Sequence, residues 1–311
     1  MAMREDLIAL YKDGFPEDSD EFVEYFFSNV YDEKNVITRY DGDMLVSAGH
    51  IVMKKLKLYN KVVDIPFLVA VATRHELRGK RLVESVMRDA LGKLSSYPFV
   101  MLYPFKHEYY RKYGFETVAN DVKLDFSKIE KKKETDANVF YRVYREYLSQ
   151  NDITIYRDIE DIRAKLESFY IDSDESELLI DGGKCVGYTL RSGDYIDELV
   201  MTNNIDDLAY SEGNMARLLD IPQALMLLDY DASISTTFAL NIRDEFMTNS
   251  IVLVSIECGK ATAEYIKEIP EDIIEIDTDI RELTSAYFGY RVPNKLAFLP
   301  KPQGVNFTDK Y

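Results

Sequence analysis

The chain has 311 residues, of which 46% are hydrophobic and 30% are charged. This composition is typical of a soluble globular protein with about two or three domains, and it excludes a disordered chain. The formal net charge of −17 opposes binding to nucleic acid and to anionic membranes. It favours cationic partners such as polyamines, aminoglycosides or lysine-rich peptides, although such a charge also serves solubility alone.

No apolar run approaches the roughly 20 residues that span a bilayer. The beginning of the chain, MAMREDLIALYKDGF, lacks the apolar core of a signal peptide, so we expect a cytoplasmic protein. Cys185 and Cys258 are far apart in the sequence, and the three histidines are scattered. This distribution predicts no bound metal and no disulfide framework. We expect both cysteines to be free thiols that are buried or half-buried.

The first segment, residues 3–31, carries apolar side chains at three- and four-residue spacing and a break at Gly14-Phe15-Pro16, which predicts two helices. In the second helix, Phe22, Tyr25 and Phe26 form a stripe that we expect to belong to the core rather than to a substrate pocket.

A β-hairpin with a turn at Asp41-Gly42 follows over residues 37–58. The expected order then is strand, helix, strand, short helix and strand, at residues 61–73, 79–94, 99–105, 107–115 and 115–126. Residues 1–130 therefore read as one α/β domain.

The charged stretch KIEKKKETDAN, residues 128–138, lacks apolar periodicity and predicts a linker. Residues 137–170 carry a helical pattern, and residues 176–201 carry the pattern of three strands. We assign 131–213 to a second domain and 214–311 to a third. The third domain is expected to open with a helix at residues 216–228 and to continue with strands, a further helix and an extended tail.

The stretch VAVATRHELRGKRL predicts the main functional site of the first domain. An apolar strand ends in a basic turn that opens a helix, so unpaired backbone N–H groups and roughly half a positive charge meet at one point. Arg78, Lys80 and Arg81 add full positive charges there. A strand–turn–helix of this kind binds a diphosphate, but a solvated basic turn looks the same, so the motif alone leaves both interpretations open.

The downstream order of helix, buried strand and the motif YYRKYGF resembles the GNAT acyltransferases. In that family the turn holds the diphosphate of acetyl-CoA, and the preceding strand contacts the pantetheine arm. By resemblance, acetyl-CoA is the co-substrate, no metal takes part, Val71, Ala72 and Thr73 contact the arm, and the turn consists of Arg78, Gly79, Lys80, Arg81, Leu82 and Val83. Arg81 and Val83 stand at two positions that usually carry glycine, which lets a phosphate approach the backbone closely.

Two later stretches, NMARLLDIPQAL and DIRELTSAYFGYR, resemble the sterol-carrier-like terminal domain of the enhanced-intracellular-survival (Eis) type acetyltransferases. The middle segment resembles a shortened form of their second GNAT-like domain. It lacks the strand–turn–helix motif, so one cofactor site is expected. The implied fold class is α/β (α+β), and the resemblance also implies a possible homo-oligomer.

The resemblance implies that Tyr110 is the general acid and that the terminal carboxylate, here on Tyr311, is the general base. Phe105 stands at a position where a polar residue is often found. Tyrosines more often pack than react, and chain ends are often uninvolved, so both roles compete with a structural interpretation. His107 is expected to face solvent at a helix start rather than to relay protons.

The implied reaction is transfer of an acetyl group from acetyl-CoA to a primary amine by direct attack. The acceptor would be an aminoglycoside, a polyamine or a lysine-type amine. A second interpretation keeps the fold without the chemistry. In it, the altered turn marks a degenerate transferase that binds a ligand or partner, for instance through the groove of the sterol-carrier-like domain.

Overall fold

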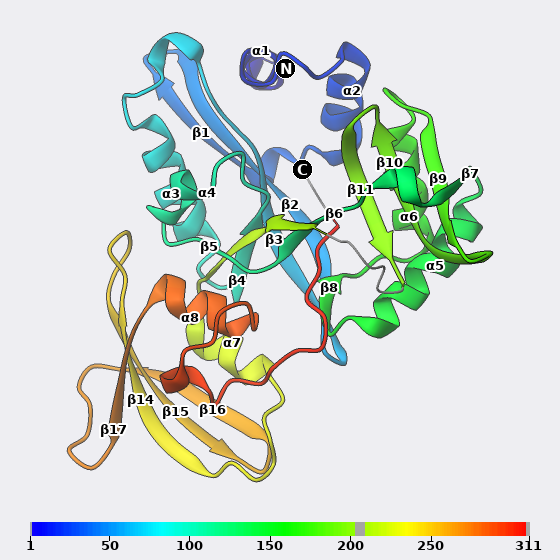
Figure 1. Cartoon of the computed structure of the whole chain (residues 1–311). Helices are drawn as coiled ribbons and strands as arrows, with labels where there is room; N and C mark the ends of the chain where they lie inside the picture. Colours follow the sequence, from blue (N-terminus) through cyan, green and yellow to red (C-terminus); the bar gives the residue numbers. More distant parts are fainter. Residues whose placement is uncertain (1, 203–208, 309–311) are drawn as a thin grey trace.

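The computed structural model describes residues 2–202 and 209–308, and Figure 1 shows how three parts of the chain surround a central sheet. The sheet has seven strands, in the order β1-β2-β3-β4-β13-β5, with β8 paired to β2. The N-terminal elements are α1 (Ala2–Gly14), α2 (Asp20–Tyr25), β1 (Val36–Asp41), β2 (Met44–Leu58), β3 (Lys61–Thr73), α3 (Leu82–Lys93), β4 (Phe99–Leu102), α4 (His107–Arg111), β5 (Glu116–Thr117) and β6 (Asn120–Lys123). The mixed α/β fold and the hairpin around Asp41-Gly42 are confirmed.

The central sheet opens between β3 and β4. These two strands are parallel, and they pair at one register position only, Phe67 with Met101. Beyond that point β3 leaves β4, so the last residues of β3 have a free edge. A cleft lined by the end of β3 lies at this divergence.

A strand from late in the sequence completes the sheet. β13 (Met215–Leu218) lies between β4 and β5 and is antiparallel to both. The helix predicted over 216–228 is therefore wrong in its first part, and α7 (Ile221–Leu227) starts only after Asp220, whose carboxylate accepts the N–H of Gln223. All four residues of β13 are buried, because the strand is covered on both faces.

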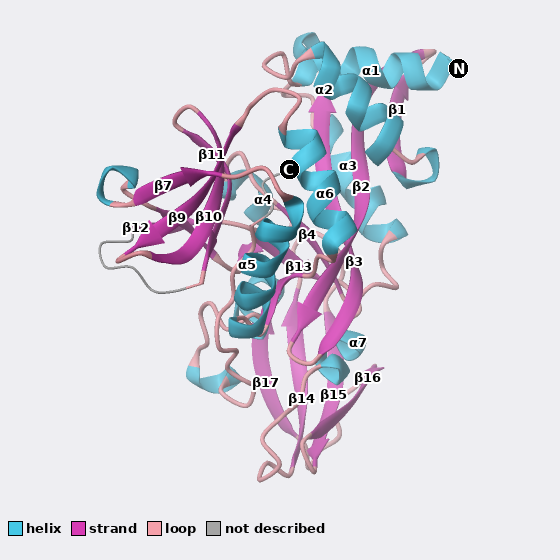
Figure 2. Ribbon diagram, turned by 90° about the vertical axis from the view of Figure 1, so that its right-hand side faces the viewer, coloured by secondary structure: helices cyan, strands magenta, loops and turns pink. Residues whose placement is uncertain are grey.

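The middle part forms a sheet of its own, in the order β11-β10-β9-β7, which packs against two helices (Figure 2). Its elements are β7 (Glu130–Lys133), α5 (Ala137–Gln150), β8 (Ile153–Ile155), α6 (Ile159–Phe169), β9 (Glu175–Asp181), β10 (Lys184–Ser192) and β11 (Tyr195–Met201). Two predictions are wrong here. The expected linker contains the edge strand β7, because exposed lysines suit a sheet edge, and the helical stretch 137–170 is interrupted by β8, which pairs with β2.

The C-terminal part packs its helices α7 and α8 between its own sheet and the central sheet. Its remaining elements are β12 (Ala209–Glu212), which pairs with β6, β14 (Thr236–Arg243), β15 (Ser250–Glu257), β16 (Lys260–Ile266), β17 (Ile274–Asp279) and α8 (Ile280–Tyr287). One apolar core joins the two sheets, and the rings of Phe99 and Phe288 lie 5.1 Å apart in it. The tail returns to the N-terminal half, where Val305 forms a β-bridge with Ile153 (Figure 1).

Three further expectations concern single features. Cys185 and Cys258 are both exposed, because each lies in or beside a tight hairpin turn, so the expectation of buried thiols is wrong. None of the helices in the described ranges has the length and apolarity to cross a bilayer. Within residues 2–202 and 209–308, no three His, Cys, Asp or Glu side chains are grouped to hold a metal ion.

His50 on β2 is buried beneath the N-terminal helices. Only 4% of its surface is exposed, and the rings of Phe26, Phe27 and Tyr31 surround it at centroid distances of 5.4, 5.8 and 5.9 Å. Burial lowers the pKa of His50 to about 4, because the charged imidazolium loses its solvation there. In the unfolded chain its pKa is about 6.5.

The shift of this pKa predicts a loss of stability in mild acid. As the pH falls below 6.5, His50 binds a proton in the unfolded state, whereas in the folded state it binds one only near pH 4. We expect His50 alone to lower the free energy of unfolding by about 2 kcal/mol between pH 7 and pH 5. Urea unfolding at both pH values, of wild type and of His50→Phe, measures this difference. An equal loss in both proteins would contradict it.

Candidate active site

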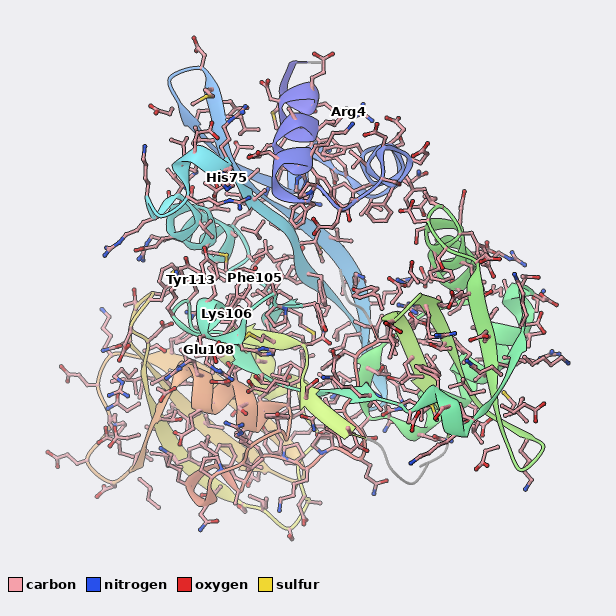
Figure 3. The ribbon with its side chains drawn as sticks, turned by 45° about the horizontal axis from the view of Figure 1, so that its top comes forward. Arg4, His75, Phe105, Lys106, Glu108 and Tyr113 are labelled. Atoms are coloured by element: carbon pink, nitrogen blue, oxygen red, sulfur yellow. The ribbon has the colours of Figure 1, made fainter. Side chains whose placement is uncertain are left out.

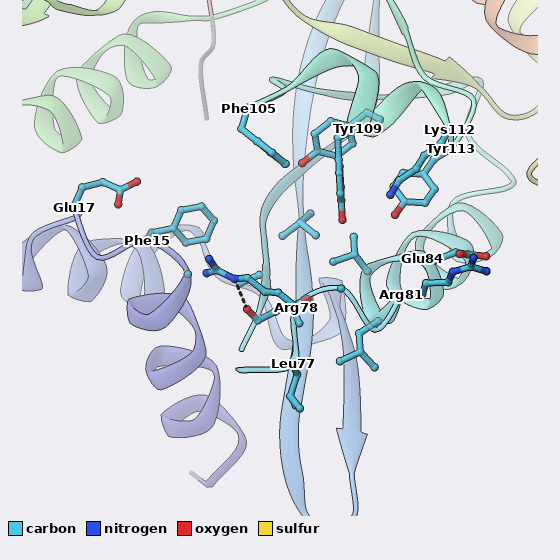
Figure 4. A pocket seen from close by; sticks show the side chains of 18 residues that line it. Phe15, Glu17, Leu77, Arg78, Arg81, Glu84, Phe105, Tyr109, Lys112 and Tyr113 are labelled. Carbon is cyan, nitrogen blue, oxygen red and sulfur yellow. Dashed lines mark hydrogen bonds between the residues drawn. The ribbon is translucent and has the colours of Figure 1, made fainter. Parts of the chain in front are cut away.

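A cleft of about 890 Å³ lies where β3 and β4 diverge (Figure 4). Its walls are the end of α1, the end of β3, the turn before α3, and α4. Every residue that the resemblance assigns to acetyl-CoA lines this cleft except the exposed Lys80, namely Val71, Ala72, Thr73, Arg78, Gly79, Arg81, Leu82 and Val83. Tyr110 and Phe105 line it as well. The structure thus brings the strand, the turn and the short helix to one site.

A β-bulge shapes the strand side of the cleft. Ala48 pairs with Ala72 and His50 pairs with Val69, so β3 has one more residue than β2 between these pairs. Ala70 has a positive φ of 48°, as the extra residue in a bulge often requires. Val71 has no register partner in β2 or β4 among the described strands. Val71 lines the cleft at this interruption of the ladder.

The turn before α3 has two left-handed residues. Gly79 has φ of 84° and Arg81 has φ of 59°. The predicted start of α3 near Gly79 is therefore wrong, because these two residues keep the chain out of the helix until Leu82. Arg81 has the left-handed backbone conformation that glycine adopts without strain, and for a residue with a side chain this conformation costs roughly 1–2 kcal/mol of conformational free energy. No side chain of a described residue caps α3, so the N–H groups of Leu82 and Val83 remain available for an anion.

The two arginines of the turn differ in direction. Arg78 extends along the floor of the cleft toward Phe15, and its Nε donates to the carbonyl oxygen of Thr73 at 3.3 Å (Figure 4). Arg81 points away, toward the side of α3 that carries Glu84. The side chain of Arg81 therefore leaves the helix N-terminus open.

Tyr110 lies on the opposite wall, and 6% of its surface is exposed. Its ring packs against Phe105, Tyr109 and Phe115 at 5.8, 5.3 and 6.2 Å, and its hydroxyl makes no hydrogen bond within the described part of the chain. Burial, and to a smaller extent the neighbouring Tyr109, raises the pKa of Tyr110 well above its ordinary value. The hydroxyl therefore stays protonated at physiological pH and can act as a donor.

The same short helix and the turn after it contribute residues that were not predicted. Tyr109, Lys112 and Tyr113 also line the cleft, and the Lys112 ammonium lies 4.0 Å from the centroid of the Tyr109 ring. Figure 4 shows the hydroxyls of Tyr109 and Tyr113 pointing toward the turn. The signal was present in the sequence, since positions 110 and 113 are three residues apart and positions 109 and 113 are four apart, spacings that bring side chains together on a helix.

His107, the first residue of α4, and Phe105, just before the helix, differ from the expectations or add to them. His107 does not face solvent freely, because its Nε2 lies 2.8 Å from the carbonyl oxygen of Gly213. Phe105 is 75% exposed although it lines the cleft. Figure 3 shows Phe105 and Tyr113 on the side of α4 that faces the N-terminal helices.

Residues 2–118 match the acetyltransferase (GNAT) domain family, and residues 221–306 match the sterol carrier protein domain family. The protein therefore has an acetyltransferase (GNAT) domain and a C-terminal sterol carrier protein domain. No curated protein has a sequence that matches this chain.

Solved structures with the same fold cover the whole chain. A probable N-acyltransferase of unknown function from Enterococcus faecalis V583 has a TM-score of 0.77 at 16% identity, with 100% of this chain and 97% of that chain covered. A GCN5-related N-acetyltransferase from Kribbella flavida has a TM-score of 0.70 at 15% identity, with 100% and 96% covered. Eis1 from Mycobacterium abscessus has a TM-score of 0.67 at 12% identity, with the same shares covered. The fold is thus Eis-like.

A second cavity, of about 580 Å³, adjoins the GNAT cleft and shares Phe15 and Glu17 with it. It lies between the N-terminal helices and the middle part of the chain. Aromatic rings and carboxylates line it, namely Tyr11, Phe15, Phe22, Phe26, Phe169 and Tyr195 with Glu17, Asp18, Asp172 and Asp197. Phe26 therefore belongs both to the core and to a pocket wall, and Phe22 is a wall residue. The stripe of Phe22, Tyr25 and Phe26 was expected to belong to the core rather than to a pocket, and two of its three residues line this cavity.

The charge of this second cavity is mostly negative. One cation, Lys165, lies among the four carboxylates, and its ammonium pairs with Asp197 at 2.6 Å. Burial raises the pKa of Asp18, the Tyr11 hydroxyl lowers it by donating at 2.7 Å, and the charges of Glu17 and Asp172 raise it further. Like charges thus meet here without enough counter-charge, and a bound cation would relieve their repulsion.

Proposed function

We propose that the protein transfers an acetyl group from acetyl-CoA to a primary amine of a polycationic small molecule, such as a polyamine or an aminoglycoside. The single observation that carries this proposal is the meeting of two unlike cavities at Phe15 and Glu17. One has an open helix N-terminus and a buried tyrosine, and the other has four carboxylates. A reaction between an anionic acetyl donor and a cationic acceptor fits this arrangement. Because it needs acetyl-CoA, we assign it to the cytoplasm.

The cleft residues fit the parts of acetyl-CoA in order. The amides of Leu82 and Val83 and the guanidinium of Arg78 would hold the diphosphate, with the helix dipole adding to the attraction. The free edge of β3 would take the pantetheine arm. The backbone amide of Val71, which lines the cleft, would then donate to the thioester carbonyl oxygen and stabilise the negative charge that develops there.

The proton balance requires a donor at sulfur and an acceptor at nitrogen. As the amine attacks the carbonyl carbon, a C–N bond forms and the C–S bond breaks. Tyr110 would donate a hydrogen bond to the leaving sulfur and then supply its proton. The resemblance assigns the proton from nitrogen to the carboxylate of Tyr311. Tyr311 lies outside the described residues, so this role rests on the resemblance alone.

The acidic cavity would bind the rest of the acceptor. Glu17 borders both cavities, so it would hold the ammonium next to the reacting amine, while Asp18 and Asp172 would bind a more distant one. The aromatic walls can cover a cation by cation–π contact. Among amines, this cavity selects those with at least two positive charges.

Asp18→Asn and Asp172→Asn test this acceptor site. Each removes one negative charge and is expected to raise the KM for a polyamine about tenfold, which corresponds to about 1.4 kcal/mol, because the cation loses one close partner. The KM for acetyl-CoA should stay unchanged. Release of free thiol measures both constants.

Glu21→Gln is a matched control, since Glu21 is an exposed carboxylate of α2 that lines neither cavity. An equal rise in the KM for the polyamine in this control would show that the overall negative charge of the protein, rather than the second cavity, attracts the amine. If monoamines of the same size reacted as well as polyamines, the proposed acceptor class would be wrong. If acetyl-CoA bound but no amine released thiol, a binding role would replace the enzymatic one.

A further inference from the structure

The loop between β14 and β15, residues 244–249, connects the sterol carrier domain to both walls of the GNAT cleft. Phe246 in this loop is buried, and its ring lies 5.0 Å from the ring of Tyr113, edge to face. The guanidinium of Arg88, on α3, lies 4.4 Å from the Phe246 ring, and its Nη1 donates to the Phe246 carbonyl oxygen at 2.7 Å. One side chain thus contacts α3 and the end of α4 together.

A buried ion pair holds this loop in place. Arg217, on β13, is 2% exposed and pairs through Nη2 with the carboxylate of Asp244. The other oxygen of Asp244 accepts the backbone N–H groups of Phe246 and Met247 at 3.1 and 3.0 Å. Asp244 therefore fixes the loop conformation and its connection to the central sheet at once. Removing one partner of such a buried pair is strongly destabilising, because it leaves an uncompensated buried charge.

Arg217 also reaches the turn that ends the tyrosine helix. Its Nη1 donates to the carbonyl oxygen of Tyr113 at 2.7 Å. The next residue, Gly114, has φ of 80°, and a Cβ atom there would lie 1.6 Å from the same Nη1. The guanidinium thus occupies the space that a side chain would need. This contact holds the chain at Tyr113, which lines the cleft together with Tyr109 and Tyr110.

We propose that Arg217, Asp244 and Phe246 are positioning residues for the acetyl-CoA cleft, so that the sterol carrier domain supplies part of the cofactor site's support. The loop sets the distance between the turn that begins α3 and the tyrosines of α4. None of the three side chains lines the cleft. The inference rests on the proposed function only in taking this cleft as the acetyl-CoA site.

The test uses Asp244→Asn and Phe246→Ala in the full chain. Both are expected to raise the dissociation constant and the KM for acetyl-CoA about tenfold and to lower kcat, while the KM for the amine stays within twofold. A purely structural role would lower the melting temperature without this selective change. If Asp244→Asn fails to fold, Phe246→Ala carries the same test, because it leaves the buried ion pair intact.

Asp229→Asn is the matched control. Asp229 also joins the C-terminal domain to the central sheet, through Lys61 of β3 at 3.2 Å, but it lies outside the residues of the cleft. It should change stability alone. Unchanged acetyl-CoA affinity in both Asp244→Asn and Phe246→Ala would overturn the inference. Failure of the proposed function is separate, since it would appear as a wild-type protein that binds acetyl-CoA without turnover, or that does not bind it.

Discussion

Tyr110→Phe is expected to lower kcat by about 10² to 10⁴-fold, the usual contribution of a positioned proton donor, while the KM for acetyl-CoA changes little. The expectation follows from the environment of this hydroxyl. It lies in the cleft wall, it lacks a hydrogen-bond partner within the described part of the chain, and its raised pKa keeps the proton in place. Removal of one oxygen atom leaves the packing of the ring with Phe105 and Phe115 intact.

The helix provides its own controls for this prediction. Tyr109→Phe and Tyr113→Phe remove hydroxyls that line the same cleft, and each should lower kcat by less than tenfold. Steady-state release of free thiol at saturating acetyl-CoA compares the three variants. A larger effect at Tyr109 than at Tyr110 would transfer the donor role to Tyr109. Full activity of Tyr110→Phe would contradict the mechanism.

Gly79→Val is expected to weaken acetyl-CoA binding by about tenfold to 100-fold. Gly79 has φ of 84°, a conformation that a β-branched residue adopts only at a cost of about 1–3 kcal/mol. The turn would move to relieve this strain, and the free N–H groups at the start of α3 would move with it. Because nothing lies within 4 Å of a Cβ atom built there, a steric clash does not contribute.

Arg81→Gly is the informative counterpart of Gly79→Val. Arg81 already has left-handed φ of 59°, so glycine removes strain at this position and should stabilise the fold by about 1 kcal/mol. The affinity for acetyl-CoA should stay within a few-fold, since the side chain points away from the cleft. Titration calorimetry of both variants tests the pair. Equal affinities of wild type and Gly79→Val would show that the turn does not bind the cofactor.

The cofactor side of the site could be predicted from the sequence because it is contiguous. Strand, turn and helix occupy residues 69–90, and the features that matter there, alternation, glycine and basic residues, are local. The second cavity could not be predicted in this way. Its carboxylates at 172 and 197 face those at 17 and 18 only because the middle sheet packs against the N-terminal helices. No local pattern encodes that contact.

The errors in the fold have the same cause. Met215–Leu218 carry a pattern that suits a helix. They form a strand because they pair with β4 and β5, whose residues are about 100 positions earlier in the chain. The lysines at 131–133 predict a linker, yet β9 offers them a free edge. In each case the partner, rather than the segment's own preference, determines the structure.

The central claim is that the cleft between β3 and α4 holds acetyl-CoA for transfer to a cationic amine. A crystal structure of the protein with acetyl-CoA tests it most directly. The account predicts the diphosphate within hydrogen-bond distance of the N–H groups of Leu82 and Val83, and the thioester sulfur beside the Tyr110 hydroxyl. An empty cleft at millimolar acetyl-CoA, or the cofactor bound elsewhere, would contradict it.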